Sequence, residues 1–481
     1  MMRHLGSFVL IGAALAAATA RGQDADKPPI KIVLHPAGEP REALKYQLLP
    51  PLLDRRPGNA AVQYLKVPHE QTQLFSDTAF WDTLDKWIEM PLPKLRKEVS
   101  GEGRKYAWLM SSRSGIIELL DRGARCDSCD WDIPIREHEF YSILLPDVQS
   151  SRSWARILAV RARLQIAGGK YDDAIHTLQT GFALARHVAQ GPTLINGLVG
   201  VAIGGMMSYQ LETLIQQPGA PNLYWALASL PRPLIDFRPG YEAEFAEIYL
   251  SYPELRDLEK KDLTPDEWRR ILQKIVGRLS AFMGSGSGSG QPDWIDLGAV
   301  ASMLEGYPRA KWSLIAEGRS PAEVEGMSAA QVILIYSMQT YNELRDDTFK
   351  WLSLPYTEAR QGMERVDKKL HESIARGREI IPFATLLLPA VFNVKNAETR
   401  SIQKIAALEV LEALRLYAAG HEGKLPESLR DVTEVPIPLD PYRGEPFIYV
   451  RKGDTAKLES PFPIDNPTLY EIQLASEGAK R

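Results

Sequence analysis

Two cysteines three positions apart are the residues of this sequence whose types and spacing most clearly suggest chemistry. Cys126 and Cys129 enclose Asp127 and Ser128, and they are the only cysteines among the 481 residues. Thiols at this spacing can close a small disulfide, exchange with a substrate disulfide or bind a metal ion. We expect a local disulfide in a surface turn, because acidic neighbours disfavour a reactive thiolate.

Two other uses of the cysteine pair stay open. A thiol redox enzyme places such a pair in a β-α-β context, which the sequence from 123 to 134 does not show. A zinc ion could be held by Cys126, Cys129 and His138 with one further ligand, although a second cysteine pair is missing. Covalent haem attachment is excluded, because Asp130 stands where that motif requires histidine.

The remaining polar residues form no recognisable catalytic motif. The His-Glu pairs that begin at His69, His371 and His421 lack the second histidine of a zinc protease helix. The run of glycine and serine from 284 to 290 has neither the strained serine of a hydrolase nor the context of a phosphate-binding loop. We therefore expect no cofactor, and an exported hydrolase with an acidic cleft remains an alternative because carboxylates and aromatic residues are abundant.

The first twenty residues have the pattern of a cleavable secretory signal peptide. Arg3 precedes an apolar run from Phe8 to Ala18, and Ala18-Thr19-Ala20 provides the small residues that signal peptidase requires. The run is too short to span a bilayer, and no cysteine lies near the cleavage site to accept a lipid. We expect a mature chain that begins near Arg21 and lies in the periplasm or outside the cell, where a disulfide is stable.

The composition is that of an ordinary globular protein. Hydrophobic residues make up 44% of the chain and charged residues 25%, and the formal net charge is −4. This charge does not favour a phosphate-binding surface, so nucleic acid is not an expected partner. With two cysteines, the fold must be held by core packing rather than by disulfides.

Hydrophobic periodicity predicts a mainly α protein, with a multi-helical body and a small α+β module at the C-terminus. A short strand is predicted at Ile30–Leu34. The predicted segments are the signal peptide at 1–20, an N-terminal extension at 21–74, a helical domain at 75–283, a linker or loop at 284–291, a second helical region at 292–395 and the C-terminal module at 396–481.

A helical hairpin is predicted between Trp154 and Val188. Apolar residues recur at helical spacing on both sides of Gly168-Gly169; they are Trp154, Leu158 and Ala162, then Ile175, Leu178 and Phe182. The segment Gly-Lys-Tyr-Asp-Asp-Ala-Ile at 169–175 resembles the start of the second helix of a tetratricopeptide repeat. The resemblance covers one repeat length and has no second copy, so it implies one hairpin in an all-α domain.

The segment from Leu194 to Met207 is apolar apart from Asn196 and allows two interpretations. Its glycines, including Gly200 and Gly204, would permit close helix packing in a membrane or in a protein core. Because glycine lowers its hydrophobicity and polar residues interrupt it, we expect a buried helix and no stable membrane span in the mature chain.

The C-terminal segment combines a helix from about Ala397 to Ala419 with three short strands. The strands are predicted at Pro446–Val450, Ala456–Ser460 and Leu469–Ala475. The series Glu412–Ala419, Gly423–Pro426 and Leu439–Phe447 resembles the globular half of a type II secretion pseudopilin. That resemblance implies a long helix packed on a small antiparallel sheet. Asp440 and Asp465 lack the spacing of calcium ligands, and the N-terminus lacks the cleavage motif of a filament subunit.

The whole chain also resembles a group of large exported proteins of unknown function from planctomycete-type bacteria. The similarity is carried by Gly169–Ile203, by Gln216–Arg238 and by the C-terminal module. It implies export and a helical body, and it supplies no activity. The sequence therefore favours a non-catalytic exported interaction or scaffold protein with a protein or cell-envelope partner, and it does not fix the oligomeric state.

Overall fold

The structure is a computed structural model that describes residues 29–100, 102–111, 114–136, 143–284, 293–460 and 468–475. The signal peptide, His138 and nearly all of the predicted linker lie outside these residues. The chain forms two compact units. Unit 1 is built mainly from Tyr241–Lys395, and unit 2 from Arg21–Ile133, Leu145–Gly240 and Asn396–Arg481. Unit 2 is thus assembled from segments distant in the sequence.

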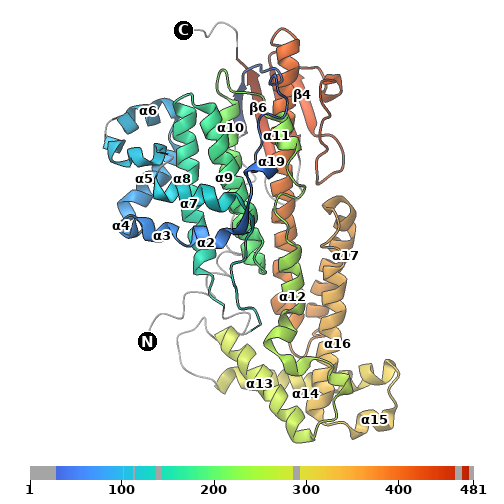
Figure 1. Cartoon of the computed structure of the whole chain (residues 1–481). Coiled ribbons are helices and arrows are strands. Elements are labelled where there is room, and N and C mark those ends of the chain that lie inside the picture. The colour runs from blue at the N-terminus through green and yellow to red at the C-terminus, as the bar shows by residue number, and fades with distance from the viewer. Residues whose placement is uncertain are drawn as a thin grey trace. The chain divides into compact units, whose positions relative to one another are not determined.

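The fold is mainly α with a small sheet, as the hydrophobic pattern predicts. After two short strands, unit 2 continues with a series of short helices, shown blue to cyan in Figure 1. They are α2 (Ala60–Tyr64), α3 (Val67–Glu70), α4 (Thr72–Ser76), α5 (Thr78–Glu89), α6 (Leu92–Ser100) and α7 (Gly115–Ala124), with the 3₁₀ segment η2 (Glu102–Met110) before α7. The sequence predicts one continuous helix from about Ala107 to Arg122, and this prediction is wrong, because Ser111 and Ser114 are not helical. Serine competes with the helix ladder for hydrogen bonds and favours such breaks.

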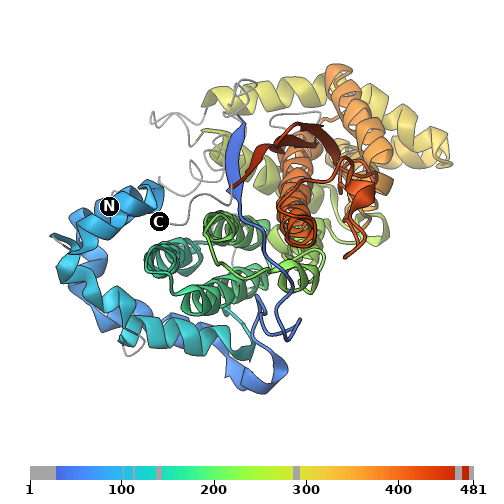
Figure 2. The ribbon, with the colours of Figure 1, turned by 90° about the horizontal axis from the view of Figure 1, so that it is seen from above.

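Three long helices form the centre of unit 2. They are α8 (Pro146–Ala167), α9 (Tyr171–Ala189) and α10 (Leu194–Ile215), and each contacts the other two. The view in Figure 2 looks along them, and the short N-terminal helices curve around one side of the bundle. The hairpin of α8 and α9 is formed as predicted, with Gly169 at a φ of +72° in the turn. Trp154, Leu158 and Phe182 are fully or almost fully buried, so both helices place their apolar faces in the core.

The apolar helix α10 packs against α9 through its glycines. A Cβ atom added to Gly200 would lie 2.7 Å from the carbonyl oxygen of Ala185, so only glycine fits there. Gly204 has room, since the nearest atom would be 3.8 Å away. Among the described residues, α10 is the one helix that is long and apolar enough to cross a membrane, and 61% of its most apolar window is buried inside the protein. A core helix satisfies the same criteria, so this is weak support for a span and agrees with the buried helix that we expected.

A four-stranded sheet joins the two ends of unit 2. Its order is β1-β6-β5-β4, with β1 (Ile30–Leu34), β4 (Ile448–Lys452), β5 (Thr455–Ser460) and β6 (Thr468–Leu474). The three C-terminal strands are antiparallel, as predicted, whereas β1 joins β6 in parallel. Alternate residues of β1, β5 and β6 are buried, which gives the sheet one covered face. A separate parallel pair consists of β2 (Arg56–Asn59) and β3 (Cys126–Ser128).

The last part of the long helix α19 (Pro389–Gly420) belongs to unit 2 and contacts the sheet through polar side chains. Lys404 of α19 donates to the hydroxyl of Tyr470 on β6 at 2.6 Å, and that hydroxyl donates to Glu212 of α10 at 2.9 Å. Lys404 also forms an ion pair with Glu212. Glu212 and Tyr470 are buried and Lys404 is half-buried, and these three groups hold α10, α19 and β6 together. The short helix α11 (Tyr224–Ala228) lies in the connection between α10 and α12.

Unit 1 is helical in the part of the chain that the structure describes. Its helices are α12 (Arg238–Ser251) from Tyr241 onward, α13 (Pro265–Gly284), α14 (Asp293–Ala316), α15 (Pro321–Gly326), α16 (Ala329–Phe349), α17 (Tyr356–Ala375), α18 (Phe383–Leu387) and the start of α19, with the turns η4 (Pro253–Leu255) and η5 (Leu258–Lys260). Its core surrounds α16, where Leu334 and Tyr341 are almost completely buried together with Trp268 and Phe383. Within the predicted second helical region, the sequence indicates helical segments from about Ala329 to Leu352 and from Glu358 to Arg378, and these correspond to α16 and α17.

Candidate functional site

The cysteine pair lies in a buried position rather than in an exposed turn. Cys126 begins β3, and Cys129 follows that strand, with its backbone N–H donating to Gln190 at 2.9 Å. Both thiols are free in the structure, so the expected disulfide is not formed there. Burial raises the pKa of the Cys126 thiol and raises the pKa of Cys129 much further. Nucleophilic thiol chemistry needs a thiolate, so this environment does not activate either cysteine.

An aromatic cluster covers the cysteine pair. Tyr64 of α2 lies with its ring centroid 6.1 Å from Trp131, 6.0 Å from Trp154 and 5.9 Å from His187. The Tyr64 hydroxyl and His187 Nδ1 are 2.9 Å apart, and the His187 ring also hydrogen-bonds to the Cys126 backbone. Burial and the neighbouring Arg186 lower the pKa of His187 to about 4. A neutral, enclosed histidine of this kind joins segments and is not accessible as a proton carrier.

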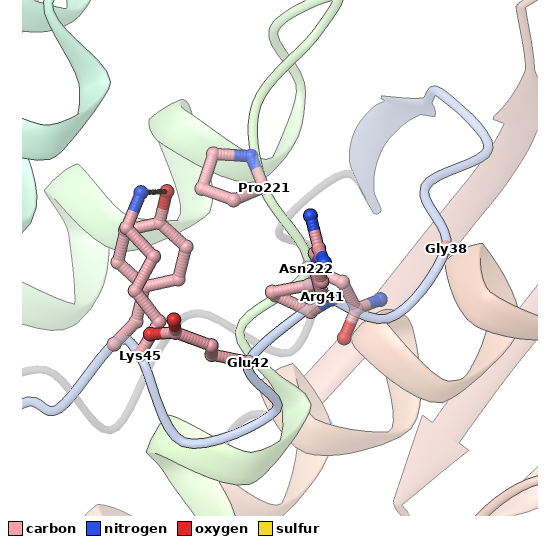
Figure 3. A pocket seen from close by; sticks show the side chains of 8 residues that line it. Gly38, Arg41, Glu42, Lys45, Pro221 and Asn222 are labelled. Carbon is pink, nitrogen blue, oxygen red and sulfur yellow. Dashed lines mark hydrogen bonds between the residues drawn. The ribbon is translucent and has the colours of Figure 1, made fainter.

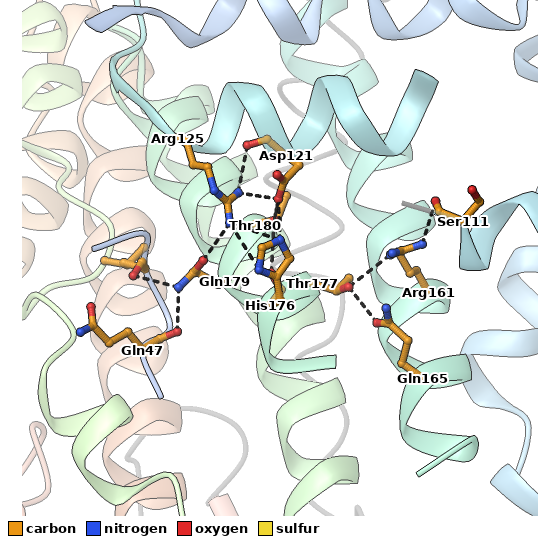
Figure 4. A network of polar contacts seen from close by, with 11 residues as sticks. Gln47, Ser111, Asp121, Arg125, Arg161, Gln165, His176, Thr177, Gln179 and Thr180 are labelled. Carbon is orange, nitrogen blue, oxygen red and sulfur yellow. Dashed lines mark hydrogen bonds and ion pairs between the residues drawn. The ribbon is translucent and has the colours of Figure 1, made fainter. Parts of the chain in front are cut away.

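Asp121 lies at the centre of a polar network between α7 and α9 (Figure 4). Its Oδ1 atom accepts hydrogen bonds from His176 at 2.9 Å and from Thr180 at 3.0 Å, and it pairs with Arg125. Burial alone would raise the pKa of Asp121, but the His176 hydrogen bond and the Arg125 charge outweigh it, so the pKa lies below the ordinary value. Gln179 extends the network from Arg125 to the backbone at 47 and 49.

The network resembles an acid-base dyad only in its Asp121 and His176 components. The His176 side chain is 56% exposed, so solvent reaches it. A nucleophilic hydroxyl would have to donate to the histidine, whereas the Thr180 hydroxyl donates to Asp121 and lies one turn along the same helix. In the same view, Arg161 joins Thr177 to the backbone of Ser111. These polar groups connect α7, α8 and α9 and do not form a nucleophile-base pair.

Asp440, part of the pseudopilin-like segment, is a structural residue. Its side chain is fully buried, accepts from the backbone of Tyr442 at 3.0 Å and accepts from Ser460 at 2.5 Å. The carboxylate therefore closes the turn before β4 onto β5. Asp465, the other acidic residue considered for calcium, lies outside the described residues.

Two carboxylates meet on α12 within unit 1. Glu244 and Glu247 are one helical turn apart and hydrogen-bond to each other, and Glu247 is 3% exposed. Burial raises the pKa of Glu244 to about 7, because two adjacent carboxylates in a poorly solvated place favour a shared proton. Arg345 of α16 packs against Phe245, with the guanidinium 4.0 Å from the ring centroid. The sequence offered no signal that distinguishes these two residues from the many other acidic residues of the chain.

An open hollow on unit 2 lies between the N-terminal coil and the segment before α11 (Figure 3). Its volume is about 430 Å³. The lining residues are Gly38, Pro40, Arg41, Glu42, Lys45, Tyr46, Pro221 and Asn222. A volume of this order accommodates a few residues of an extended peptide or a small ligand.

The two sides of the hollow differ in how firmly their polar groups are held. On one side Lys45 donates to Tyr46 at 3.1 Å and to Asp172 at 3.3 Å, and Tyr46 donates to Asp172 at 2.9 Å. On the other side Arg41 is exposed, and it makes no hydrogen bond or ion pair with the described residues. Arg41 is therefore free to bind a group that enters the hollow.

A fully buried ion pair fixes the backbone beneath the hollow. Arg415 pairs with Glu412 at 2.9 Å, and both side chains are 0% exposed. The same guanidinium donates to the carbonyl groups of His35 at 2.9 Å and Ala220 at 2.7 Å. Asn222 donates to the Glu412 carbonyl at 2.9 Å. The N-terminal coil and the Pro221 segment are consequently held at a fixed separation by α19.

The described residues contain no group of three or more His, Cys, Asp or Glu side chains arranged to hold a metal ion. His138, the third candidate zinc ligand, lies outside them. No family model, curated protein or solved structure matches the chain. The function must therefore be inferred from the geometry of this chain alone.

Sequence reasoning missed the hollow for an identifiable reason. Residues 38–46 form irregular coil with no periodicity, and their partners Pro221 and Asn222 are about 180 positions away. The one local signal is the combination of prolines, charges and Tyr46 in a coil that nevertheless buries Leu48. Such a coil must be held against another element, but the sequence does not say which one.

Proposed function

We propose that this chain is an exported, non-catalytic helical interaction protein that binds a protein partner through the hollow of Figure 3. The observation that carries the proposal is the Arg41 guanidinium, which has no partner among the residues that the structure describes, beside the apolar surfaces of Pro40, Tyr46 and Pro221. A mixed lining of this kind suits an extended peptide segment with a carboxylate next to an apolar side chain. The fixed backbone beneath the hollow reduces the entropy lost on binding.

The polar groups first considered for chemistry support a structural role instead. The cysteines are buried with raised pKa values, His187 is enclosed, and Asp121 accepts three interactions that join helices. A thiol redox function would need an accessible thiolate, so these surroundings give it little support. Zinc binding remains a proposal that depends on His138.

A photo-crosslinking experiment tests the partner proposal. A photoreactive amino acid at Glu42 should crosslink one protein in an extracytoplasmic extract that the same group at Glu427, a distant exposed site, does not capture. Binding of the purified partner should then weaken at least about tenfold in Arg41→Glu, since a charge-assisted hydrogen bond is lost. Arg430→Glu, an exposed arginine elsewhere in unit 2, is the matched control. Equal affinity of Arg41→Glu and the wild type would refute the proposal.

Export is the second component of the proposal, and the pattern of residues 1–20 supports it. Expression in a Gram-negative host should give a mature protein whose first residue is Arg21, as read by N-terminal sequencing. A protein that retains Met1 and stays in the cytoplasm would contradict export. The proposed relationship to pseudopilins concerns the C-terminal module alone and is supported by the residue series between Glu412 and Phe447.

A hydrolase is the second candidate function, and the Glu244–Glu247 pair favours it. Paired carboxylates that share a proton can act as general acid and general base. A panel of ester, peptide and glycoside substrates should then show turnover that is lost in both Glu244→Gln and Glu247→Gln. Absence of turnover in the wild type between pH 4 and pH 8 would remove this candidate.

A further inference from the structure

Two adjacent leucines project from the surface of unit 2. Leu52 and Leu53 form the turn η1 (Leu52–Asp54), and their exposed fractions are 77% and 96%. Single exposed leucines are common, but two neighbours at the tip of one turn are not accounted for by the fold. Their side chains contribute nothing to the core, so their position must have another physical cause.

The turn that carries these leucines is internally braced. The backbone N–H of Asp54 donates to Pro51 at 3.0 Å, and the N–H of Arg55 donates to Leu52 at 3.2 Å. The Arg55 side chain donates to the Pro50 carbonyl at 3.0 Å. Proline at 50 and 51 restricts the backbone before the turn. The leucines are thus held outward by the backbone and would lose little conformational entropy on insertion into an apolar phase.

Three guanidinium groups accompany the leucines. Arg55 and Arg56 are exposed, and Arg186 of α9 is near enough to both Arg55 and Asp236 to be affected by their charges, since burial and Arg55 lower its pKa while Asp236 raises it. None of the three forms an ion pair with the residues that the structure describes. Asp54 offsets one positive charge, and Asp236, which pairs with Arg238, also attracts Arg186. Arginines therefore outnumber carboxylates near the leucine tip.

We propose that this surface, composed of Leu52, Leu53, Arg55, Arg56 and Arg186, binds an anionic lipid bilayer. The leucines enter the boundary between head groups and acyl chains, and the arginines contact lipid phosphates. An apolar tip with a basic rim is the pattern of interfacial membrane binding, in which apolar burial and attraction to anionic lipid act together. The net charge of −4 repels the rest of the chain from the same bilayer, which orients the tip toward it. This inference is independent of the hollow and of its partner.

Vesicle co-sedimentation tests the proposal with the purified chain lacking residues 1–20. The wild type should sediment with vesicles of phosphatidylcholine containing about one-third phosphatidylglycerol, and binding should weaken at high salt. Leu52→Ser/Leu53→Ser should lower the partition coefficient at least about tenfold, because burial of two leucines is lost. Arg56→Gln should lower it about fivefold at low salt, because one charge near the surface is lost while the bond from Arg55 to Pro50 that braces the turn is kept. Leu439→Ser, at an exposed leucine elsewhere in unit 2, should bind like the wild type.

Three outcomes would overturn the proposal. The first is wild-type binding no stronger to anionic vesicles than to pure phosphatidylcholine. The second is unchanged vesicle binding in the Leu52→Ser/Leu53→Ser variant. The third is a wild type that binds no vesicles but dimerises with increasing concentration in analytical ultracentrifugation, while the double variant stays monomeric. That result would assign the tip to contact with a second copy of the chain. Because both leucines are exposed, unchanged thermal unfolding is expected and confirms that each variant is folded. Arg41→Glu should retain vesicle binding, which separates this surface from the hollow.

Discussion

Buried charges in unit 2 connect segments that are distant in the sequence. Arg415 is the clearest example, since one guanidinium meets a carboxylate on its own helix and backbone carbonyls near residues 35 and 220. The half-buried Lys404 likewise connects its helix α19 to α10 and β6. A buried guanidinium is costly unless every donor is satisfied, so its presence specifies which segments must lie together.

We predict that Arg415→Met destabilises unit 2 by about 3–5 kcal/mol, because it leaves Glu412 buried without its cation. Arg415→Met/Glu412→Leu should recover much of that loss, since both charges are then absent. The free energy of unfolding from chemical denaturation measures both effects. A single variant as stable as the wild type would show that the pair is not needed to close the fold around residues 35 and 220.

His187 gives unit 2 a predicted weakness in acid. Its folded-state pKa of about 4 lies below the ordinary value of 6.5, so the native state binds fewer protons than the unfolded chain between these values. Its contribution is fully present above about pH 6.5 and is lost as the pH falls toward 4, by about 3 kcal/mol in total. His187→Gln should remove this slope from the unfolding free energy measured against pH. The exposed His69→Gln should leave it unchanged.

At the scale of elements, glycine decides how closely α10 approaches α9. Gly200 faces the Ala185 carbonyl, whereas Gly205, on the same helix, is exposed with no atom within 4 Å of an added Cβ. We predict that Gly200→Ala destabilises the protein by about 1–3 kcal/mol through overpacking. Gly205→Ala should be neutral or stabilising by up to about 1 kcal/mol, because alanine favours the helix. Thermal denaturation of the two variants checks the contrast, and equal shifts would argue against close packing of α9 and α10.

An element could be predicted from the sequence when the interactions that specify it join residues close together in the chain. The α8–α9 hairpin and the strands β1, β5 and β6 were predicted because apolar periodicity and turn residues are local signals. The parallel pairing of β1 with β6 was not, since Ile32 and Ile472 are 440 positions apart and no local pattern joins them. The burial of the cysteines was missed for the same reason, because Tyr64 and His187 enclose them from distant helices.

The candidate site shows a similar limit. The sequence offered Cys126, Cys129 and His138 because their types are chemically distinctive, and the structure encloses the two cysteines in a core. Arg41 and the leucines at 52 and 53 belong to no sequence motif, and they stand out because they are exposed and Arg41 has no partner in the described part of the chain. Exposure and unpaired charge are properties of the folded chain, so a one-dimensional pattern could not select them.

At the scale of the whole molecule, the two units are expected to respond to pH in opposite directions. In unit 1, burial raises the pKa of Glu244 to about 7, above the ordinary value of 4.5, so the native state there binds more protons than the unfolded chain between these values. Its contribution is fully present below about pH 4.5 and is lost as the pH rises through 7, by about 3 kcal/mol in total. In unit 2, the His187 contribution is lost in the other direction.

Hydrogen exchange resolved by segment can follow each unit separately. From pH 5 to pH 8, after correction for the intrinsic exchange rate, amides of α16 in unit 1 should lose protection, while amides of α9 in unit 2 should not. Glu244→Gln retains a hydrogen bond to Glu247 without a titrating proton, so it should abolish the loss in α16 and raise the stability of unit 1 at pH 8. The exposed Glu242→Gln on the same helix should leave the loss unchanged. If the amides of α9 and α16 lost protection together, the two units would unfold as one cooperative body. The titration of Glu244 or His187 would then change the stability of both units equally.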